Sequence, residues 1–290
     1  MSESDHSKKT QYSEPELSED LKIALRNWMP EIIELTRNVG QSILEIYRSS
    51  FQVNNKKDNT PVTCADLAAN EQIVKSLSLL TPDIPVLSEE SDEVDFARRQ
   101  SWETYWLVDP LDGTRAFIER SGEFSINIAL IHRHYPVIGV VYSPVRQVCY
   151  YACIQNGAFR LENNDEARPL HVREHCPDYP MIAGTRSSRS PALLAYLKNV
   201  EKHFKGYGMT FLGSSLKSCL IAEGKADLYV RLGPTSEWDT AAAQCIVEEA
   251  GGRITDLQMQ RLSYNNKDSL LNPHFFVFGD KSIHWEKFLP

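Results

Sequence analysis

The chain contains the stretch Val108-Asp109-Pro110-Leu111-Asp112-Gly113-Thr114, in which two carboxylates stand three residues apart. The apolar residues ahead of it predict a short buried strand over residues 104–108, so Asp109 is expected where that strand emerges from the core. Pro110 has no backbone N–H, and we expect it to stop regular strand pairing. The stretch therefore predicts a carboxylate at the end of a buried strand.

The second carboxylate of this stretch is expected to lie beside the first. Asp112 and Gly113 are typical of a sharp turn, and the carbonyl of Leu111 can point the same way. Such oxygens are costly to bring together unless cations lie among them. Mg²⁺ prefers hard oxygen ligands, and two metal ions about 4 Å apart suit phosphoryl-ester hydrolysis. Spacing alone leaves a metal site and an ordinary Asp-Gly turn equally open.

Two further acidic segments follow the same pattern. Glu89 and Glu90 come after a short apolar run, and Asp239 stands at the start of a predicted helix. Taken alone, Glu89 and Glu90 fit a solvated loop and Asp239 fits a helix N-cap. Together the three segments weaken these ordinary interpretations, although spacing by itself does not decide for a metal site.

Length and charge limit the class of protein. The 290 residues allow one large domain or two of ordinary size, and the net charge of −8 argues against a nucleic-acid partner bound through a basic surface. Nothing near the N-terminus resembles a signal peptide, and the apolar runs are far shorter than the roughly 20 residues needed to span a bilayer. We expect a cytoplasmic protein, with peripheral association with the inner face of the membrane left open, as either a monomer or a homodimer.

The order of elements predicts two halves. Residues 1–19 are expected to form a disordered tail, residues 20–160 an N-terminal α+β half with most of the acidic site, and residues 161–290 a C-terminal α/β half. A long amphipathic helix is expected over about 20–49, with a break at Pro30. The other predicted helices cover about 63–80, 191–204, 216–223 and 240–250. The predicted strands cover 85–87, 104–108, 125–132, 137–143, 148–154, 158–161, 181–183, 209–212, 226–230 and 252–254.

Longer strings of sequence resemble a known family. The stretch Val108–Thr114, followed by Gly122-Glu123-Phe124-Ser125-Ile126-Asn127-Ile128-Ala129-Leu130, resembles the first signature of the inositol monophosphatase superfamily. Its second signature resembles Glu237-Trp238-Asp239-Thr240-Ala241-Ala242. The resemblance covers roughly residues 20–280, in the expected order. It implies a layered αβαβα sandwich, which is consistent with the two halves.

Finer features resemble one branch of that superfamily, the CysQ-type 3′(2′),5′-bisphosphate nucleotidases. They are Asn59-Thr60-Pro61-Val62-Thr63-Cys64-Ala65-Asp66, Pro85-Val86-Leu87-Ser88-Glu89-Glu90, Gly213-Ser214-Ser215-Leu216-Lys217, Ala222-Glu223-Gly224 and Arg231-Leu232-Gly233-Pro234-Thr235. One departure is Ser188, at a position where many nucleotidases have a histidine. It weakens the nucleotide assignment locally and leaves the metal site untouched.

The resemblance also implies roles for individual residues. The implied ligands of two or three Mg²⁺ ions are Glu89, Asp109, Asp112, Asp239 and the carbonyl of Leu111. Asp66 and Thr114 resemble the catalytic pair that orients and activates the attacking water, since a threonine hydroxyl can accept from water while donating to a carboxylate. Glu90 fits either an assisting role or a surface position. The implied substrate contacts are Glu89, Leu111, Asp112, Gly113, Thr114, Ser214, Lys217, Arg231 and Asp239.

The implied activity is removal of the 3′-phosphate of adenosine 3′,5′-bisphosphate to give AMP, with the 5′-phosphosulfate form as a second substrate. Lys217 and Arg231 would contact the second phosphate, although exposed helix and loop charges are the alternative. Inositol phosphates or sugar bisphosphates remain alternative substrates. A protein of another class, a silent metal- or nucleotide-binding regulator, would have no need for the Asp66–Thr114 pair.

Overall fold

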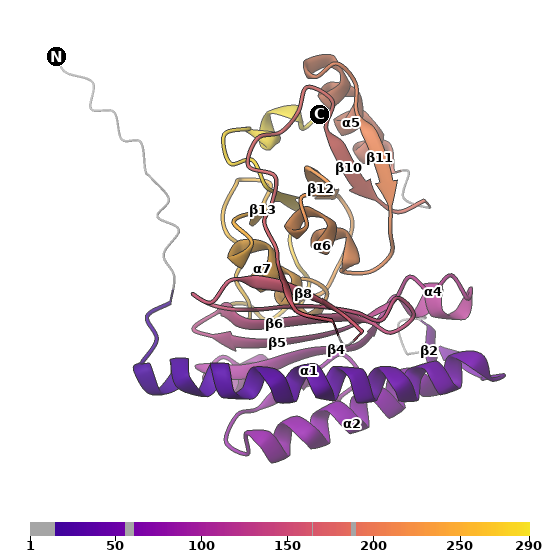
Figure 1. The fold of residues 1–290 in the computed structure, drawn as a ribbon, viewed down its shortest axis with the longest axis vertical. Helices are drawn as coiled ribbons and strands as arrows, with labels where there is room; N and C mark the ends of the chain where they lie inside the picture. The colour runs from indigo at the N-terminus through magenta and orange to yellow at the C-terminus, as the bar shows by residue number, and fades with distance from the viewer. Residues whose placement is uncertain (1–14, 56–60, 164, 187–189) are drawn as a thin grey trace.

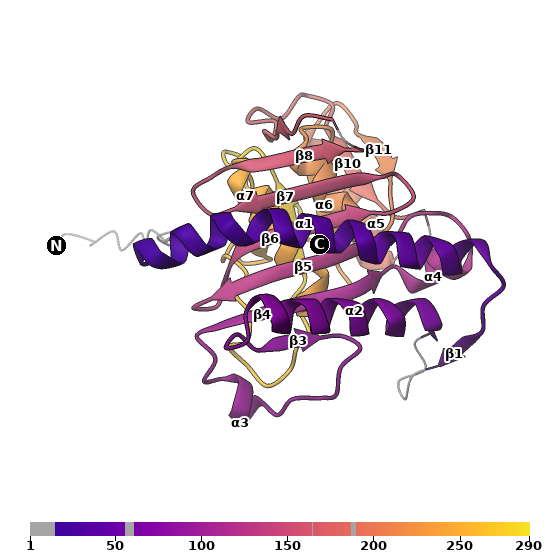
Figure 2. The same ribbon diagram turned by 60° about the horizontal axis from the view of Figure 1, so that its bottom comes forward.

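The computed structural model describes residues 15–55, 61–163, 165–186 and 190–290, and these form five alternating layers (Figure 1). In the first layer α1 (Glu19–Arg48) and α2 (Cys64–Leu80) lie side by side in front of a seven-stranded sheet, as Figure 2 shows. Behind that sheet lie α6 (Leu216–Ala222) and α7 (Ala241–Glu249), then a five-stranded sheet, and finally α5 (Pro191–His203). The predicted αβαβα sandwich is confirmed.

The seven-stranded sheet is formed by strands within residues 86–169. Its first two strands in spatial order are parallel, and every later neighbouring pair is antiparallel. In spatial order the strands are β3 (Val86–Ser88), β4 (Thr104–Asp112), β5 (Ser125–His132), β6 (Tyr135–Ser143), β7 (Val148–Cys153), β8 (Ala158–Glu162) and β9 (Arg168–Pro169).

The five-stranded sheet belongs to the C-terminal half. Three of its strands are parallel and two pair antiparallel, in the spatial order β11 (Gly208–Phe211), β10 (Met181–Gly184), β12 (Leu228–Arg231), β14 (Phe275–Phe278) and β13 (Arg253–Asp256). The remaining elements are β1 (Val53–Asn55), β2 (Pro61–Thr63), α3 (Phe96–Arg99), α4 (Thr114–Ile118), η1 (Glu237–Asp239) and η2 (Trp285–Phe288). Several of these are too short to give a periodic signal in sequence.

The layers are held together by cores on both faces of each sheet. Along β4, Trp106 and Val108 pack with α1 and α2, whereas Tyr105 and Leu107 pack on the opposite face with α6 and α7. This is the alternation that a strand buried on both faces requires. Gly139 in β6 allows α7 to lie close, because a Cβ atom there would come within 2.2 Å of the Ala242 carbonyl oxygen. The α6 and α7 layer is therefore packed tightly on the first sheet.

The first helix runs unbroken through Pro30, so the expected break at this residue is wrong. Pro30 is exposed, whereas its neighbours Met29 and Ile32 are buried against the sheet. A proline inside a helix costs about 3 kcal/mol, and the buried apolar face of a 30-residue helix offsets that cost.

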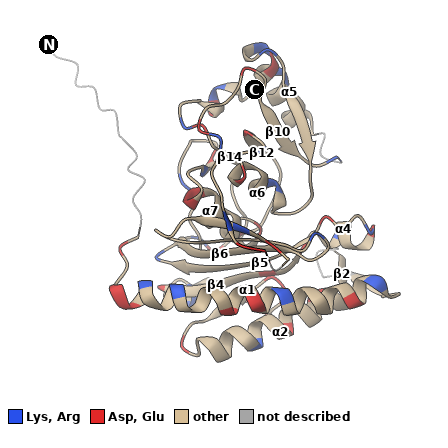
Figure 3. Ribbon diagram, viewed as in Figure 1, with Lys and Arg blue, Asp and Glu red and all other residues tan. Residues whose placement is uncertain are grey.

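Acidic and basic residues are spread along the same helix in Figure 3.

Strand β4 also continues past the expected stop at Pro110. Asp109 pairs with Asn127 and Asp112 pairs with Ser125, with a shift of register between the two pairs. The shift leaves Pro110 in an irregular segment, where its missing N–H removes no regular ladder bond. Pairing is thus interrupted after Asp109 and resumes at Asp112, so the expectation that it ends at Pro110 is wrong.

Most of the predicted tail, residues 1–14, lies outside the described residues, as does Ser188. The division into halves at residues 160 and 161 stays a prediction. None of the helices in the described ranges is both long enough and apolar enough to cross a membrane.

Candidate active site

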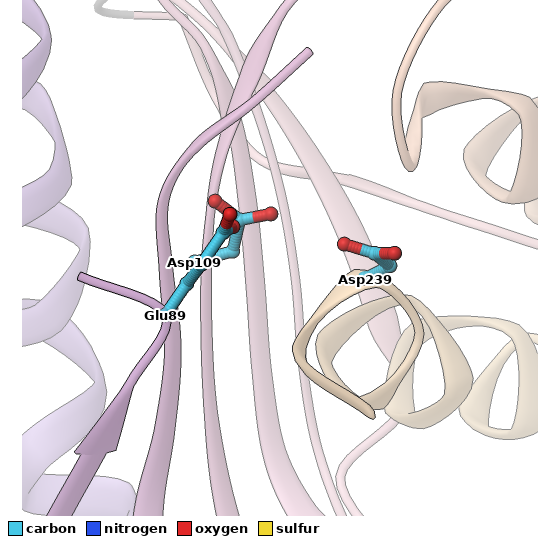
Figure 4. Close-up of side chains that lie close together, drawn as sticks. All are labelled: Glu89, Asp109 and Asp239. Atoms are coloured by element: carbon cyan, nitrogen blue, oxygen red, sulfur yellow. The ribbon is translucent and has the colours of Figure 1, made fainter. Parts of the chain in front are cut away.

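Three carboxylates from different parts of the sequence meet at the edge of the first sheet. Glu89, Asp109 and Asp239 each offer an oxygen, and these atoms lie within 4.8 Å of one another (Figure 4). Glu89 follows β3 and Asp109 lies in the parallel strand β4, where Ser88 pairs with Val108. Parallel neighbours end at the same edge of a sheet, so the two carboxylates become adjacent.

Asp239 reaches the cluster from the C-terminal half. It is the last residue of η1, and its Oδ2 accepts a hydrogen bond of 2.8 Å from the backbone N–H of Ser236. It does not cap α7, whose N-cap is Thr240 without a side-chain capping bond. The alternative of a plain N-cap for the following helix is therefore wrong, because the carboxylate turns back toward Asp109.

The electrostatics of the cluster call for cations. Burial raises the pKa of Asp109 well above its usual range, and the negative charges of Glu89, Asp112 and Asp239 raise it further. The pKa of Asp239 is raised to about 7, chiefly by burial and then by the charge of Asp112. Converging carboxylates disfavour one another's ionised forms. The donors are hard oxygens, the ligands that Mg²⁺ prefers, so the residues present fit this metal.

Asp112 lies beside this group of three and lines the same cavity as Glu89 and Asp239. Its Oδ2 accepts from the backbone N–H of Ser215 at 2.6 Å, and lies 2.8 Å from the Ser215 hydroxyl oxygen. The amide nitrogen of Asn127 lies 3.3 Å from the same oxygen. Asp112 is thus held by two residues that sequence reasoning did not assign to it.

Asp66 and Thr114 form the hydrogen-bonded pair that the sequence predicted. The Thr114 hydroxyl donates to Oδ1 of Asp66 at 2.9 Å. Oδ2 of Asp66 accepts from the N–H and hydroxyl of Thr63, at 2.8 and 2.6 Å, in the capping box of α2. Gly113, with φ +98°, supplies the left-handed turn that precedes Thr114 and α4. Asp66 is therefore fixed on both oxygens while Thr114 faces the cavity.

The cavity at the cluster has a volume of about 600 Å³, and its lining includes Gly113, Thr114, Ser214, Lys217 and Arg231. All five were predicted substrate contacts, and the structure brings them to the same cavity. Leu111 is buried, and its carbonyl oxygen lies 3.4 Å from the Thr114 hydroxyl. The predicted site residues are therefore close together, although they come from both halves of the chain.

Lys217 is a buried cation rather than an exposed helix charge. Only 5 % of its surface is exposed, and its Nζ donates to the carbonyl of Ser214 at 2.5 Å. Nζ also lies 5.2 Å from the centre of the Tyr229 ring. Burial lowers the pKa of Lys217 to about 8, an effect opposed by Asp112 and aided by Arg231. A buried lysine with a lowered pKa at the wall of a cavity is a candidate functional residue.

A second, smaller pocket of about 170 Å³ adjoins the cavity and shares Thr185, Lys217, Tyr229 and Arg231 with it. Its other walls are largely apolar, with Ile182, Leu193, Leu197 and Met209 among them. Space for an apolar group thus lies next to the cations.

Sequence reasoning missed the supporting polar network. Asn127 is buried in β5 between apolar neighbours, with 1 % of its surface exposed. An amide at an interior position of a central strand must find polar partners, and that was the signal available. The ion pair between Arg186 and Glu123, 3.2 Å long at the cavity wall, joins residues far apart in sequence and gave no comparable signal.

Comparison with known proteins places the chain in a family. The model of the inositol monophosphatase family matches residues 24–284. The chain belongs to the inositol monophosphatase family. Within this family it is 45 % identical over 251 residues to the 3′(2′),5′-bisphosphate nucleotidase CysQ of Salmonella typhimurium, covering 86 % of this chain and 98 % of that protein. It is 44 % identical to the protein of the same name from Escherichia coli K12, over the same shares of both chains.

Solved structures of family members share the fold. The crystal structure of CysQ from Bacteroides thetaiotaomicron matches with a TM-score of 0.76 and 36 % identity, over 90 % of this chain and 98 % of that one. The extragenic suppressor protein suhB from Bartonella henselae matches with a TM-score of 0.72 and 28 % identity, over 91 % and 98 %. The resemblance read from the motifs is confirmed.

Proposed function

We propose that this protein is a Mg²⁺-dependent phosphatase that removes the 3′-phosphate of adenosine 3′,5′-bisphosphate, giving AMP and phosphate. The 5′-phosphosulfate form of the nucleotide is the proposed second substrate. The observation that carries the proposal is the bonded pair of Asp66 and Thr114 beside the carboxylate cluster. The relatives named 3′(2′),5′-bisphosphate nucleotidase, at up to 45 % identity, support the choice of substrate.

Glu89, Asp109, Asp112, Asp239 and the carbonyl of Leu111 are the proposed ligands of two or three Mg²⁺ ions. When bound, Mg²⁺ would neutralise phosphate charge and lower the pKa of water, which supplies most of the activation. Support comes from the raised pKa values of Asp109 and Asp239, which are caused first by burial and then by the neighbouring carboxylates.

Thr114 and Asp66 would orient the attacking water. The Thr114 hydroxyl proton is directed to Asp66, so its oxygen can accept a hydrogen bond from water. Asp66 is held by Thr63 and cannot turn away. The backbone N–H groups of Gly113 and Thr114, at the turn into α4, would bind phosphate oxygens.

Lys217 and Arg231 would bind the second phosphate of the nucleotide. Both residues line the metal cavity and the adjoining apolar pocket. A second phosphate would therefore contact these cations, and the ring of the nucleotide would occupy the apolar pocket. An inositol monophosphate has neither a second phosphate nor an apolar ring. The cations and the pocket therefore favour a bisphosphate nucleotide.

A substrate panel tests the proposal. With Mg²⁺ present, adenosine 3′,5′-bisphosphate should have a higher kcat/KM than inositol 1-phosphate, inositol 1,4-bisphosphate or fructose 1,6-bisphosphate. Equal or faster turnover of an inositol phosphate would overturn the nucleotide assignment. Binding of the nucleotide without cleavage would instead support a silent regulator. The cytoplasmic location and the choice between monomer and homodimer stay predictions.

A further inference from the structure

We propose that Ser215, together with Asn127, is a positioning residue that joins Asp112 to Asp239 and thereby sets the affinity of the site for Mg²⁺. The inference rests on the proposed role of both aspartates as metal ligands. It adds a function for two side chains that need not touch metal or substrate.

Ser215 contacts both halves of the acidic site. Its hydroxyl oxygen lies 2.8 Å from Oδ2 of Asp112, which ends β4 of the first sheet. The same oxygen lies 2.6 Å from the backbone carbonyl of Asp239, in η1 of the C-terminal half. Ser215 is 5 % exposed and stands at the N-cap of α6, between the two sheets. The buried hydroxyl of Ser215 thus bridges Asp112 and Asp239, two proposed metal ligands from different parts of the fold.

Asn127 completes the arrangement from β5. Its amide nitrogen lies 2.9 Å from the Ser215 hydroxyl oxygen and 3.3 Å from Oδ2 of Asp112. Its amide oxygen accepts from the hydroxyl of Ser125 at 3.0 Å, which fixes the direction of the amide group. The nitrogen of Asn127 is therefore held toward Asp112 and Ser215.

The Ser215 hydroxyl cannot donate to both of its acceptors at once, so the donors available to each must be counted. The Ser215 hydroxyl has one proton and two acceptors, Asp112 Oδ2 and the Asp239 carbonyl. When the proton goes to Asp239, Asp112 keeps two donors, the N–H of Ser215 and the amide of Asn127. Oδ2 of Asp112 is satisfied in either case.

These contacts leave one oxygen of Asp112 for a cation. Within the described ranges, hydrogen bonds to Asp112 reach Oδ2 alone. Fixing Oδ2 orients the carboxylate, so the cost of ordering Oδ1 is met before a cation binds. Outer partners of metal ligands typically change metal affinity about 10- to 100-fold when they are removed.

The test is binding of Mg²⁺ alone, measured by titration calorimetry on the full chain without substrate. Ser215→Ala should weaken Mg²⁺ binding at least about tenfold, and Ser215→Thr, which keeps the hydroxyl, should stay closer to wild type. Ser143→Ala is the matched control, because Ser143 is fully buried and its hydroxyl has no partner in the part of the chain described. The control should bind Mg²⁺ as wild type does.

A purely structural role would give a different pattern. Ser215→Ala removes hydrogen bonds and Ser143→Ala removes none, so in EDTA the unfolding temperature should fall further for Ser215→Ala. The discriminating quantity is the rise in unfolding temperature on adding Mg²⁺, which should shrink for Ser215→Ala and stay at the wild-type value for Ser143→Ala. In steady-state assays Ser215→Ala should raise the Mg²⁺ concentration for half-maximal rate, with little change in substrate KM at saturating Mg²⁺. Equal Mg²⁺ affinity in Ser215→Ala and wild type would overturn the inference.

Asn127→Ala provides a second route if Ser215→Ala is poorly folded. It should weaken Mg²⁺ binding, and the double variant should lose less than the product of the two single effects, because both side chains act on one oxygen. Independent effects would contradict a shared role. Wild-type protein that binds Mg²⁺ but leaves the bisphosphate uncleaved would refute the proposed function while these affinities still decide the inference.

Discussion

The Thr114 hydroxyl lies 2.9 Å from Oδ1 of Asp66, although the two residues are separated by 48 positions in the chain. Asp66 belongs to the first turn of α2, and Thr114 begins α4 after the turn at Gly113. Thr114 lines a cavity that is also lined by Glu89, Asp112 and Asp239. This juxtaposition of a polarised hydroxyl and acidic oxygens is what hydrolysis of a phosphate ester requires.

Removing the Thr114 hydroxyl should slow the reaction without unfolding the protein. Thr114→Val keeps the shape of the side chain and removes the bond to Asp66, so kcat should fall about 100-fold or more, in the range for positioned acid–base groups. Thr114→Ser is the control that keeps a hydroxyl and should retain most activity. Equal rates for the Val and Ser variants would contradict the role of this group.

Asp112→Asn should lower turnover by orders of magnitude while the protein stays folded. The substitution preserves size and removes the negative charge of a proposed metal ligand, so Mg²⁺ binding should weaken as well. Steady-state rates over a range of Mg²⁺ concentrations, with circular dichroism as the check on folding, measure the effect. Near-normal activity would refute the ligand role of Asp112.

The charge of Lys217 should give a pH dependence to substrate capture. The pKa of Lys217 is lowered to about 8, so its positive charge is lost in the free enzyme as the pH rises through this value. With adenosine 3′,5′-bisphosphate, kcat/KM should therefore fall above about pH 8. Lys217→Arg keeps its charge throughout and should lack this part of the fall. Identical pH profiles would show that Lys217 does not bind the second phosphate.

Metal removal should destabilise the protein, and one substitution should reverse that effect. In EDTA the ionised form of Asp109 is disfavoured first by burial and then by the charges of Glu89, Asp112 and Asp239, so Asp109→Asn should raise the unfolding temperature by roughly 2–4 °C per kcal/mol of that cost relieved. The same variant should lose the stabilisation that Mg²⁺ gives to wild type. Asp92→Asn, at an exposed position, is the control and should match wild type in both conditions. A lower unfolding temperature for Asp109→Asn in EDTA would contradict this account.

Acidic residues at the ends of strands were predictable from the sequence, whereas the uninterrupted course of α1 and β4 was not. Glu89 and Asp109 were found because acids follow apolar runs, and a parallel pair of strands brings such positions together. The predictions at Pro30 and Pro110 were wrong, because the local rules for proline predict a break at each. At Pro30 the long buried face of α1 offsets the local cost, and at Pro110 a shift of register absorbs the missing donor.

Contacts between distant segments were beyond local reasoning. Nothing local in the sequence marks Ser215 as a partner of the acidic site, yet its hydroxyl contacts Asp112 and the carbonyl of Asp239, which are 103 and 24 residues away. No periodicity or spacing encodes that pairing. Likewise, the sequence favoured a substrate contact over a surface charge only moderately for Lys217, and its burial depends on the surrounding layers.

Gly139 sets a geometric limit on the acidic site, through the position of α7. Asp239 is joined to α7 by Thr240 alone, and α7 can approach β6 only because residue 139 has no side chain. Any larger residue there would push the helix outward and draw Asp239 away from Asp109. A residue with no side chain thus sets how closely the helix that follows Asp239 packs on the sheet that carries Asp109.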